Sequence, residues 1–349
     1  MARKTFRKVI VTPEIIEEIN PKNKKLVKRF LKEKNTRCSD KTIKGYTSDL
    51  NIFFCWNVLE NDNKFFVDLK KIELADFFSY AVEELKWGSA RFSRMRSALS
   101  SLSEFIERFY DEEYPTFRNI VLKAIELMPK VARRKKTILS EEQVNDLLRH
   151  LKEDINKPQE ACLLALAICS GARKSELLRF DVDIIDENNT AFDGLFIETK
   201  EKIKTKGFTK EGKLLYKYII KDLFMPYYNE WLKVRKEVLE KNSVEDHGKL
   251  FIRRDGQPAK ESTIEGWIGK WEKYLNVDIY LHCLRHYTCT YLSRVGMESE
   301  LIIEIFGWSS SDMYKIYNDM SAKDKKWKGT NKLKEHLEKS TSSTVEKEP

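Results

Sequence analysis

The sequence predicts a mainly α-helical protein with a small β-hairpin or sheet, an α+β fold in two domains. Apolar residues recur at steps of three and four along most of the chain, which is the period of an amphipathic helix. Runs of β-branched and aromatic residues, the signal of strands, occur only around one lysine-rich segment at residues 200–213. The length of 349 residues, 41% of them hydrophobic, exceeds the ~100–200 residues of a usual single domain.

The first third of the chain has the pattern of a helical bundle. Ser39 and Asp40 favour the start of a helix that runs through Phe54, because such side chains accept hydrogen bonds from a first helical turn. The same periodicity predicts further helices at residues 72–86, 90–109 and 116–127. Glycine and proline residues separate these segments.

A basic segment at residues 129–137 follows this bundle. It contains five basic residues in nine, Lys130, Arg133, Arg134, Lys135 and Lys136, and little that could be buried. We therefore expect an extended linker between two domains. A cationic linker can lie along a phosphate backbone. The alternative is a solvated loop without a partner.

The second domain begins with a capping-box pattern at Ser140 and Gln143. Residues 158–170 predict a nearly all-apolar helix at the centre of the second core. Strands are expected at residues 192–199 and 214–220, with the tip of a hairpin between them. Further helices are predicted at residues 223–241, 261–275, 281–295, 298–306 and 312–320.

Composition excludes several classes of protein. The longest apolar run, residues 161–169, is far shorter than the ~20 residues that cross a bilayer. The N-terminus lacks the long apolar stretch of a signal peptide, so we expect a cytoplasmic protein without membrane contact. The six cysteines contain no C-x-x-C pair and predict neither a disulfide nor a zinc site. The net charge of +9 favours a polyanionic partner without proving one.

Two short motifs carry side chains that suit a phosphate. Arg173 follows a buried helix that ends at a glycine, and Glu176 could orient its guanidinium. His282 and Arg285 lie three residues apart on one face of an otherwise apolar helix. Each pair alone has an ordinary explanation too, namely a surface ion pair or a core histidine beside a surface arginine.

Two tyrosines, Tyr314 and Tyr317, follow a Gly-Trp break at Trp308. Tyrosines in such positions usually pack half-buried. A tyrosine becomes a nucleophile only where nearby cations stabilise its phenolate, because its unperturbed pKa is about 10. The motifs therefore indicate chemistry only if the fold brings them together.

Taken in order, these residues resemble the pattern of the tyrosine recombinases, the phage integrase family. That pattern is Arg, Lys, His-x-x-Arg, His or Trp, and then Tyr, and this chain fills each position in sequence order. The resemblance spans about residues 42–320. It implies a helical core-binding domain at residues 21–128 and a catalytic domain at 138–320, with an N-terminal extension at 1–20 and a C-terminal tail at 321–349.

By position, the resemblance assigns Arg173 and Arg285 to the scissile phosphate and His282 to proton transfer. Trp308 stands where many members have a histidine, and its indole N–H could donate to the phosphate. Tyr317 would be the nucleophile that forms a 3′-phosphotyrosyl bond and releases a 5′-hydroxyl. Tyr314 fits the spacing less well.

The general acid of the family is a lysine in the β-hairpin. Lys204 fits this place best, because Lys204 and Thr205 match a Lys-Thr pair at a strand end. Lys200, Lys202 and Lys206 remain alternatives. Glu176 would act through Arg173 by orienting it.

The resemblance implies a site-specific DNA recombinase without metal or nucleotide cofactor, because the phosphotyrosyl bond conserves the energy of the broken phosphodiester. Its partners would be double-stranded DNA attachment sites, three further copies in a synaptic homotetramer, and accessory DNA-bending proteins. A type IB topoisomerase-like enzyme and a non-catalytic DNA-binding regulator are the alternatives. Phosphate contacts are expected from Lys41, Lys44, Arg91, Arg94, Arg96, Arg133, Arg134, Lys135, Lys136 and Lys206.

Overall fold

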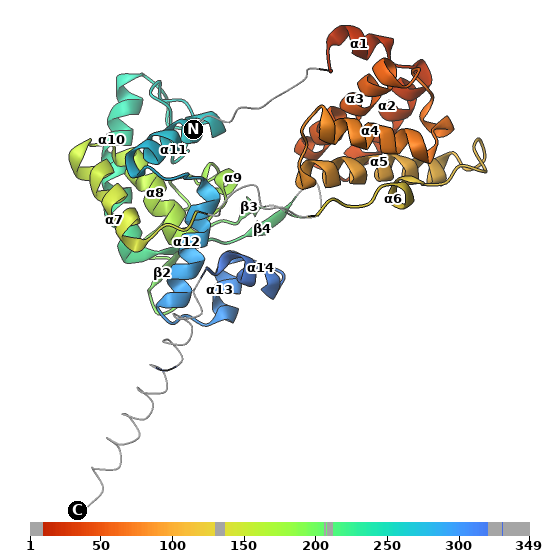
Figure 1. Ribbon diagram of the computed structural model, residues 1–349. Coiled ribbons are helices and arrows are strands. Elements are labelled where there is room, and N and C mark those ends of the chain that lie inside the picture. The colour runs from red at the N-terminus through yellow and green to blue at the C-terminus, as the bar shows by residue number, and fades with distance from the viewer. Residues whose placement is uncertain (1–9, 130–136, 206, 208–211, 320–329, 331–349) are drawn as a thin grey trace, which may run out of the picture. The chain divides into compact units, whose positions relative to one another are not determined.

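The computed structural model describes residues 10–129, 137–205, 207, 212–319 and 330, which form two compact units (Figure 1). The chain passes from the first unit to the second within the basic segment. Several expected features lie outside the described residues: Arg133, Arg134, Lys135, Lys136, Lys206 and all but residue 330 of the C-terminal tail at 321–349. The mainly α-helical fold with small antiparallel sheets is the one that the sequence predicts.

The first unit is built from helices. They are α1 (Pro13–Glu18), α2 (Pro21–Asn35), α3 (Asp40–Glu60), α4 (Lys71–Glu83), α5 (Ser89–Phe109) and α6 (Val121–Ala124), with a 3-10 turn at Phe66–Asp68. Ser39 caps α3 as predicted, since its hydroxyl accepts a hydrogen bond from the backbone N–H of Thr42. The ring of Phe53 packs edge-to-face on Phe66 and Phe77 in an aromatic core.

The helix expected at residues 116–127 is largely wrong, since only the four residues of α6 are helical there. The side chain of Arg96 on α5 donates to the carbonyls of Leu122 (2.9 Å) and Ile125 (2.6 Å). These two carbonyls therefore accept hydrogen bonds from α5 instead of from the backbone N–H groups of a longer helix. Val121 and Ile125 are buried in the core, so tertiary contacts outweigh helix propensity in this segment.

The second unit packs around α8 (Pro158–Ser170), the apolar helix that the sequence predicts as central. Ser140 and Gln143 form the predicted capping box at the start of α7 (Glu141–Arg149). α8 contacts α10 (Lys221–Lys241) and α12 (Leu281–Arg294). The other helices are a π-helical turn at His150–Asp154, α9 (Lys174–Leu177), α11 (Glu261–Leu275), α13 (Ser299–Phe306) and α14 (Ser311–Tyr317).

In the described part of the chain, five short strands replace the two that the sequence predicts. One antiparallel sheet has the order β1-β2-β5, and β3 pairs with β4 as a hairpin. Positive φ angles at Phe192, Asp193 and Gly194 make a turn inside the first expected strand. Lys217 interrupts the second, because it bonds Thr199 through its own N–H (3.0 Å) and carbonyl (2.9 Å). The strands are β1 (Thr190–Ala191), β2 (Phe196–Glu198), β3 (Ile203–Thr205), β4 (Lys213–Leu215) and β5 (Tyr218–Ile220).

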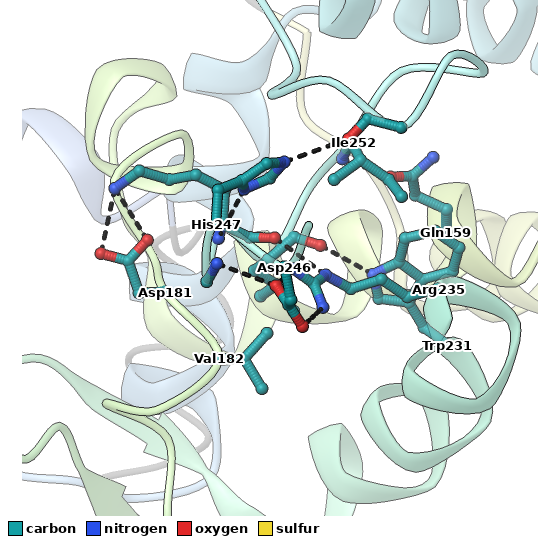
Figure 2. A network of polar contacts seen from close by, with 12 residues as sticks. Gln159, Asp181, Val182, Trp231, Arg235, Asp246, His247 and Ile252 are labelled. Atoms are coloured by element: carbon teal, nitrogen blue, oxygen red, sulfur yellow. Dashed lines mark hydrogen bonds and ion pairs between the residues drawn. The ribbon is translucent and has the colours of Figure 1, made fainter. Parts of the chain in front are cut away.

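A polar network fixes the segment after α10 against that helix (Figure 2). The buried guanidinium of Arg235 donates to both carboxylate oxygens of Asp246, at 2.7 and 2.5 Å, and to the carbonyl of Lys249. Hydrogen bonds from Arg235 lower the pKa of Asp246 to about 2. The indole of Trp231 donates to the carbonyl of Leu250 (2.9 Å). The buried charge of Arg235 therefore holds the segment after α10 in place.

Gly171 ends α8 in the left-handed conformation, with φ of 57°, and a Cβ there would lie 2.6 Å from Cζ of Phe306. We predict that Gly171→Ala lowers the free energy of unfolding by about 2–4 kcal/mol, through backbone strain and this clash. Denaturation in urea, followed by circular dichroism, measures the loss. Gly266→Ala is the matched control, because an added Cβ on the exposed face of α11 meets nothing within 4 Å. Equal effects of the two substitutions would contradict the prediction.

Candidate active site

The turn after α8 brings two arginines from distant segments together. Arg173 occupies the N-cap of α9, directly after the tight turn at Gly171. The carbonyl of Gly171 accepts a hydrogen bond from Nη1 of Arg285 on α12. The spacing in the sequence does not predict this contact between the end of α8 and α12, which only the fold supplies.

Glu176 binds Arg173 as its position predicts. Its carboxylate is fully buried and accepts from the backbone N–H of Arg173 (3.0 Å) and from Nη1 of the same residue (2.8 Å). The ammonium of Lys217 lies 2.8 Å from Oε2 of Glu176. Burial alone would raise the pKa of Glu176, but the charge and hydrogen bond of Lys217, with the bonds from Arg173, lower it to about 2.

Arg285 is a buried cation surrounded by aromatic rings. It is 1% exposed, and its guanidinium lies 4.6 Å from the ring centre of Phe306, 5.2 Å from Trp308 and 5.3 Å from Tyr317. Burial, and then the charge of Arg173, lowers its pKa to about 10, so it stays charged at neutral pH. Its Nε and Nη2 are buried without a hydrogen-bond partner among the described residues, which is typical of a site that binds an anion.

Tyr317 lies at the end of α14 beside these cations. It is 4% exposed, and its hydroxyl is 2.5 Å from Nε2 of His282. The phenol ring is stacked against His286, at 4.4 Å between ring centres, and against Trp308, at 5.1 Å. Nδ1 of His286 lies 3.1 Å from Oδ2 of Asp319, just beyond α14. The ring of the expected nucleophile is therefore held by contacts on several sides.

His282 has the protonation state that a proton acceptor needs. Partial desolvation by its surroundings, and then the charges of Arg285 and Arg173, lower the pKa of its imidazole below the ordinary value of 6.5. The ring is consequently neutral at neutral pH. A neutral imidazole whose Nε2 carries the lone pair can accept the proton of the Tyr317 hydroxyl.

Lys204 is exposed, unlike the residues of this buried cluster. It occupies β3 between the buried residues Ile203 and Thr205, and its own side chain is exposed. The carbonyl of Lys204 accepts from Arg179 (2.6 Å). Of the alternatives, Lys200 pairs with Asp186, Lys202 lies over the ring of Tyr216, and Lys206 is outside the described residues.

Sequence reasoning missed Lys217 and His286, two buried residues of the cluster. Lys217 is the one charged residue among the apolar and aromatic residues from 214 to 220, which is a signal for a buried charge. His286 follows directly after the His-x-x-Arg motif on the buried side of α12. Neither pattern reveals its partner, because Glu176 and Asp319 lie far away in the sequence.

The basic residues expected to contact DNA in the first unit differ in their surroundings. Lys41 and Lys44 are exposed on α3. Arg91 and Arg94 both pair with the buried carboxylate of Asp49, Arg94 at 2.8 Å through Nε. These two arginines, like Arg96, therefore have a role in the fold of this unit.

The chain is similar to a known family of proteins. The chain matches the model of the phage integrase family over residues 137–324. The tyrosine recombinase XerC of Corynebacterium glutamicum is 25% identical over 289 residues, which cover 81% of this chain and 82% of that protein. XerC of Thermodesulfovibrio yellowstonii is 24% identical over 288 residues, 82% of this chain and 87% of that protein.

Solved structures show the same fold. XerH recombinase bound to a palindromic difH substrate superposes with a TM-score of 0.63 at 18% identity, covering 93% of this chain and 85% of that one. A lambda integrase dimer bound to a COC′ core site gives a TM-score of 0.61 at 14% identity, covering 88% and 81%.

The chain therefore belongs to the phage integrase family. It is a tyrosine-type site-specific DNA recombinase, as the resemblance in its sequence predicts. None of these matches favours a type IB topoisomerase or a non-catalytic regulator. Within the described residues, no helix is long and apolar enough to cross a membrane.

The packing of Trp308 against Phe306 and Tyr317 predicts how substitutions at Trp308 affect stability. We expect Trp308→Ala to lower the free energy of unfolding by about 3–5 kcal/mol, because it leaves a cavity between the two rings. Trp308→Phe keeps an aromatic ring there and should cost less than half as much. Urea denaturation followed by circular dichroism compares them, and equal losses would show that ring packing is not the source.

Proposed function

We propose that Tyr317 attacks a DNA phosphodiester and forms a 3′-phosphotyrosyl bond, with release of a 5′-hydroxyl. The observation that carries this proposal is the 2.5 Å contact between the Tyr317 hydroxyl and Nε2 of His282, beside the buried guanidinium of Arg285. The second tyrosine, Tyr314, is bonded instead to Ser293 (3.0 Å) and Asn318 (2.7 Å). Relatives named as tyrosine recombinases support the assignment.

Each side chain has a role in a balanced transfer. Neutral His282 accepts the proton of Tyr317 while the phenolic oxygen bonds to phosphorus and the bond from phosphorus to the 5′-oxygen breaks. Arg173 and Arg285 bind the non-bridging oxygens and stabilise the charge that develops on them. The free indole N–H of Trp308, buried and without a partner among the described residues, suits a further hydrogen bond to the phosphate.

The leaving 5′-oxygen needs a proton, and we assign its transfer to Lys204. This lysine is exposed on the β3–β4 hairpin, so its ammonium can reach a bound duplex. The phosphotyrosyl bond conserves the energy of the phosphodiester, so rejoining by a 5′-hydroxyl requires neither metal nor nucleotide.

We further assign residues 21–128 to a core-binding domain and 138–320 to the catalytic domain. Lys41 and Lys44, exposed on α3, are the described residues of the first unit that best suit phosphate contacts. Exchange between two duplexes requires four strand cuts, which supports a homotetramer at paired attachment sites. Accessory DNA-bending proteins and a cytoplasmic location remain part of this proposal.

Tyr317→Phe is expected to abolish covalent attachment to DNA, because only the hydroxyl is lost. A nicked duplex carrying the attachment sequence that flanks the gene, incubated without metal, traps the adduct for a denaturing gel and mass spectrometry. Tyr314→Phe is the matched control and should retain the adduct. An adduct that survives in Tyr317→Phe, or the absence of any adduct on DNA that the wild-type chain binds, would refute this assignment.

The lowered pKa of His282 predicts the pH dependence of cleavage. The imidazole must be neutral to accept a proton, so the rate should stay level above about pH 6.5 and fall only at lower pH. Single-turnover adduct formation at saturating DNA measures this profile. His282→Ala should lose the acid limb and react about 10²–10⁴-fold more slowly. A midpoint above 6.5, or an unchanged limb in His282→Ala, would argue against the assignment.

A further inference from the structure

Lys217 is a buried lysine whose backbone and side chain are both fixed. It lies between β4 and β5 and is 2% exposed. Its N–H donates to Oγ1 of Thr199 (3.0 Å), and its carbonyl accepts from the N–H of Thr199 (2.9 Å). Lysine is almost never fully buried unless it is paired, so this position requires an explanation.

The partner of Lys217 is the carboxylate that also holds Arg173. Nζ of Lys217 lies 2.8 Å from Oε2 of Glu176, and Nη1 of Arg173 lies 2.8 Å from Oε1. One buried carboxylate thus bridges two cations. It fixes the guanidinium of Arg173 with one oxygen while the other oxygen is held by Lys217.

The charges of this cluster show what Lys217 adds. With Glu176 and Arg173 alone, the carboxylate would neutralise the guanidinium that has to bind a phosphate. Lys217 supplies a second positive charge to the same carboxylate, so Arg173 keeps charge for a substrate anion. Burial lowers the pKa of Lys217, and the positive charges of Arg285 and Arg173 add to that effect. The charge and hydrogen bond of Glu176 oppose it and favour the charged ammonium.

We propose that Lys217 is a positioning residue for DNA cleavage, which acts through Glu176 to orient Arg173 and to keep the phosphate site cationic. This inference rests on the proposed role of Arg173 at the scissile phosphate. Lys217 contacts no reacting atom in this scheme. A displacement of about 1 Å at a group that binds the reacting phosphate can reduce the rate about 100-fold, so the expected effect is on cleavage rather than on DNA affinity.

Four variants test the proposal: Lys217→Met, Lys217→Arg, Glu176→Gln and the double variant Lys217→Met/Glu176→Gln. The rate of adduct formation on the nicked duplex is measured at saturating DNA, and the Kd by fluorescence anisotropy. We expect Lys217→Met to react about 100-fold more slowly with less than a threefold change in Kd. Lys217→Arg should recover to within about tenfold of wild type. The double variant should be no slower than either single variant, because coupled residues are not additive.

Lys249→Met is the matched control, since Lys249 also pairs with a carboxylate, Asp181 at 2.7 Å, but within the network of Figure 2. It should react like the wild type. The proposal is wrong if Lys217→Met reacts within threefold of the wild-type rate, or if this variant weakens DNA binding without slowing adduct formation. It is also wrong if the double variant is slowed by the product of the factors for the two single variants. An inactive but folded Lys217→Arg would make Lys217 a proton donor instead, because arginine does not give up a proton.

A second readout separates this inference from the proposed function and from misfolding. The ¹⁵N–¹H signal of Arg173 Nε, assigned by its loss in Arg173→Lys, should shift or broaden in Lys217→Met and return in Lys217→Arg. The double variant removes both buried charges and therefore controls for folding. If the wild type forms no adduct but the signal responds, the proposed function fails and the role of Lys217 in cleavage fails with it, while its orienting effect on Arg173 stands. If the wild type cleaves and the signal does not respond, the positioning role is wrong.

Discussion

The second unit depends on the burial of one cation, the guanidinium of Arg285. A charge taken out of water must find hydrogen bonds or aromatic faces, and Arg285 finds the carbonyl of Gly171 and the rings of Phe306, Trp308 and Tyr317. These partners come from the end of α8, the end of α13, the turn after it and the end of α14. The solvation of a single side chain therefore sets where the residues of the site meet.

This constraint places the residues of the site in contact with one another without a bound substrate. The ring of Tyr317 is stacked against His286 and Trp308, and its hydroxyl contacts His282. The carboxylate of Glu176 in turn fixes Arg173. Groups held in place need no reorganisation when charge develops on a phosphate, and that preorganisation is the main source of electrostatic catalysis.

The sequence predicts most of the helices well, because they depend on local spacing. The cap at Ser39 and the apolar helix α8 follow from capping and period, and motif order alone gives the series from Arg173 to Tyr317, whose roles stay predictions. The pairing of Lys217 with Glu176 could not be predicted, since it depends on how the residue between β4 and β5 meets α9 across the fold. The helix expected at residues 116–127 failed for the same reason, because Arg96 on another helix takes its carbonyls.

The site also contains buried hydrogen-bond donors that destabilise the fold. Nε and Nη2 of Arg285 and Nε1 of Trp308 are buried donors with no partner in the described part of the chain. Each such donor costs about 1–3 kcal/mol of stability. A phosphate oxygen at hydrogen-bond distance would remove this cost, so in the proposed function the relief of unsatisfied groups would contribute to the free energy of phosphate binding. Occupancy of the site by that anion would then stabilise the second unit.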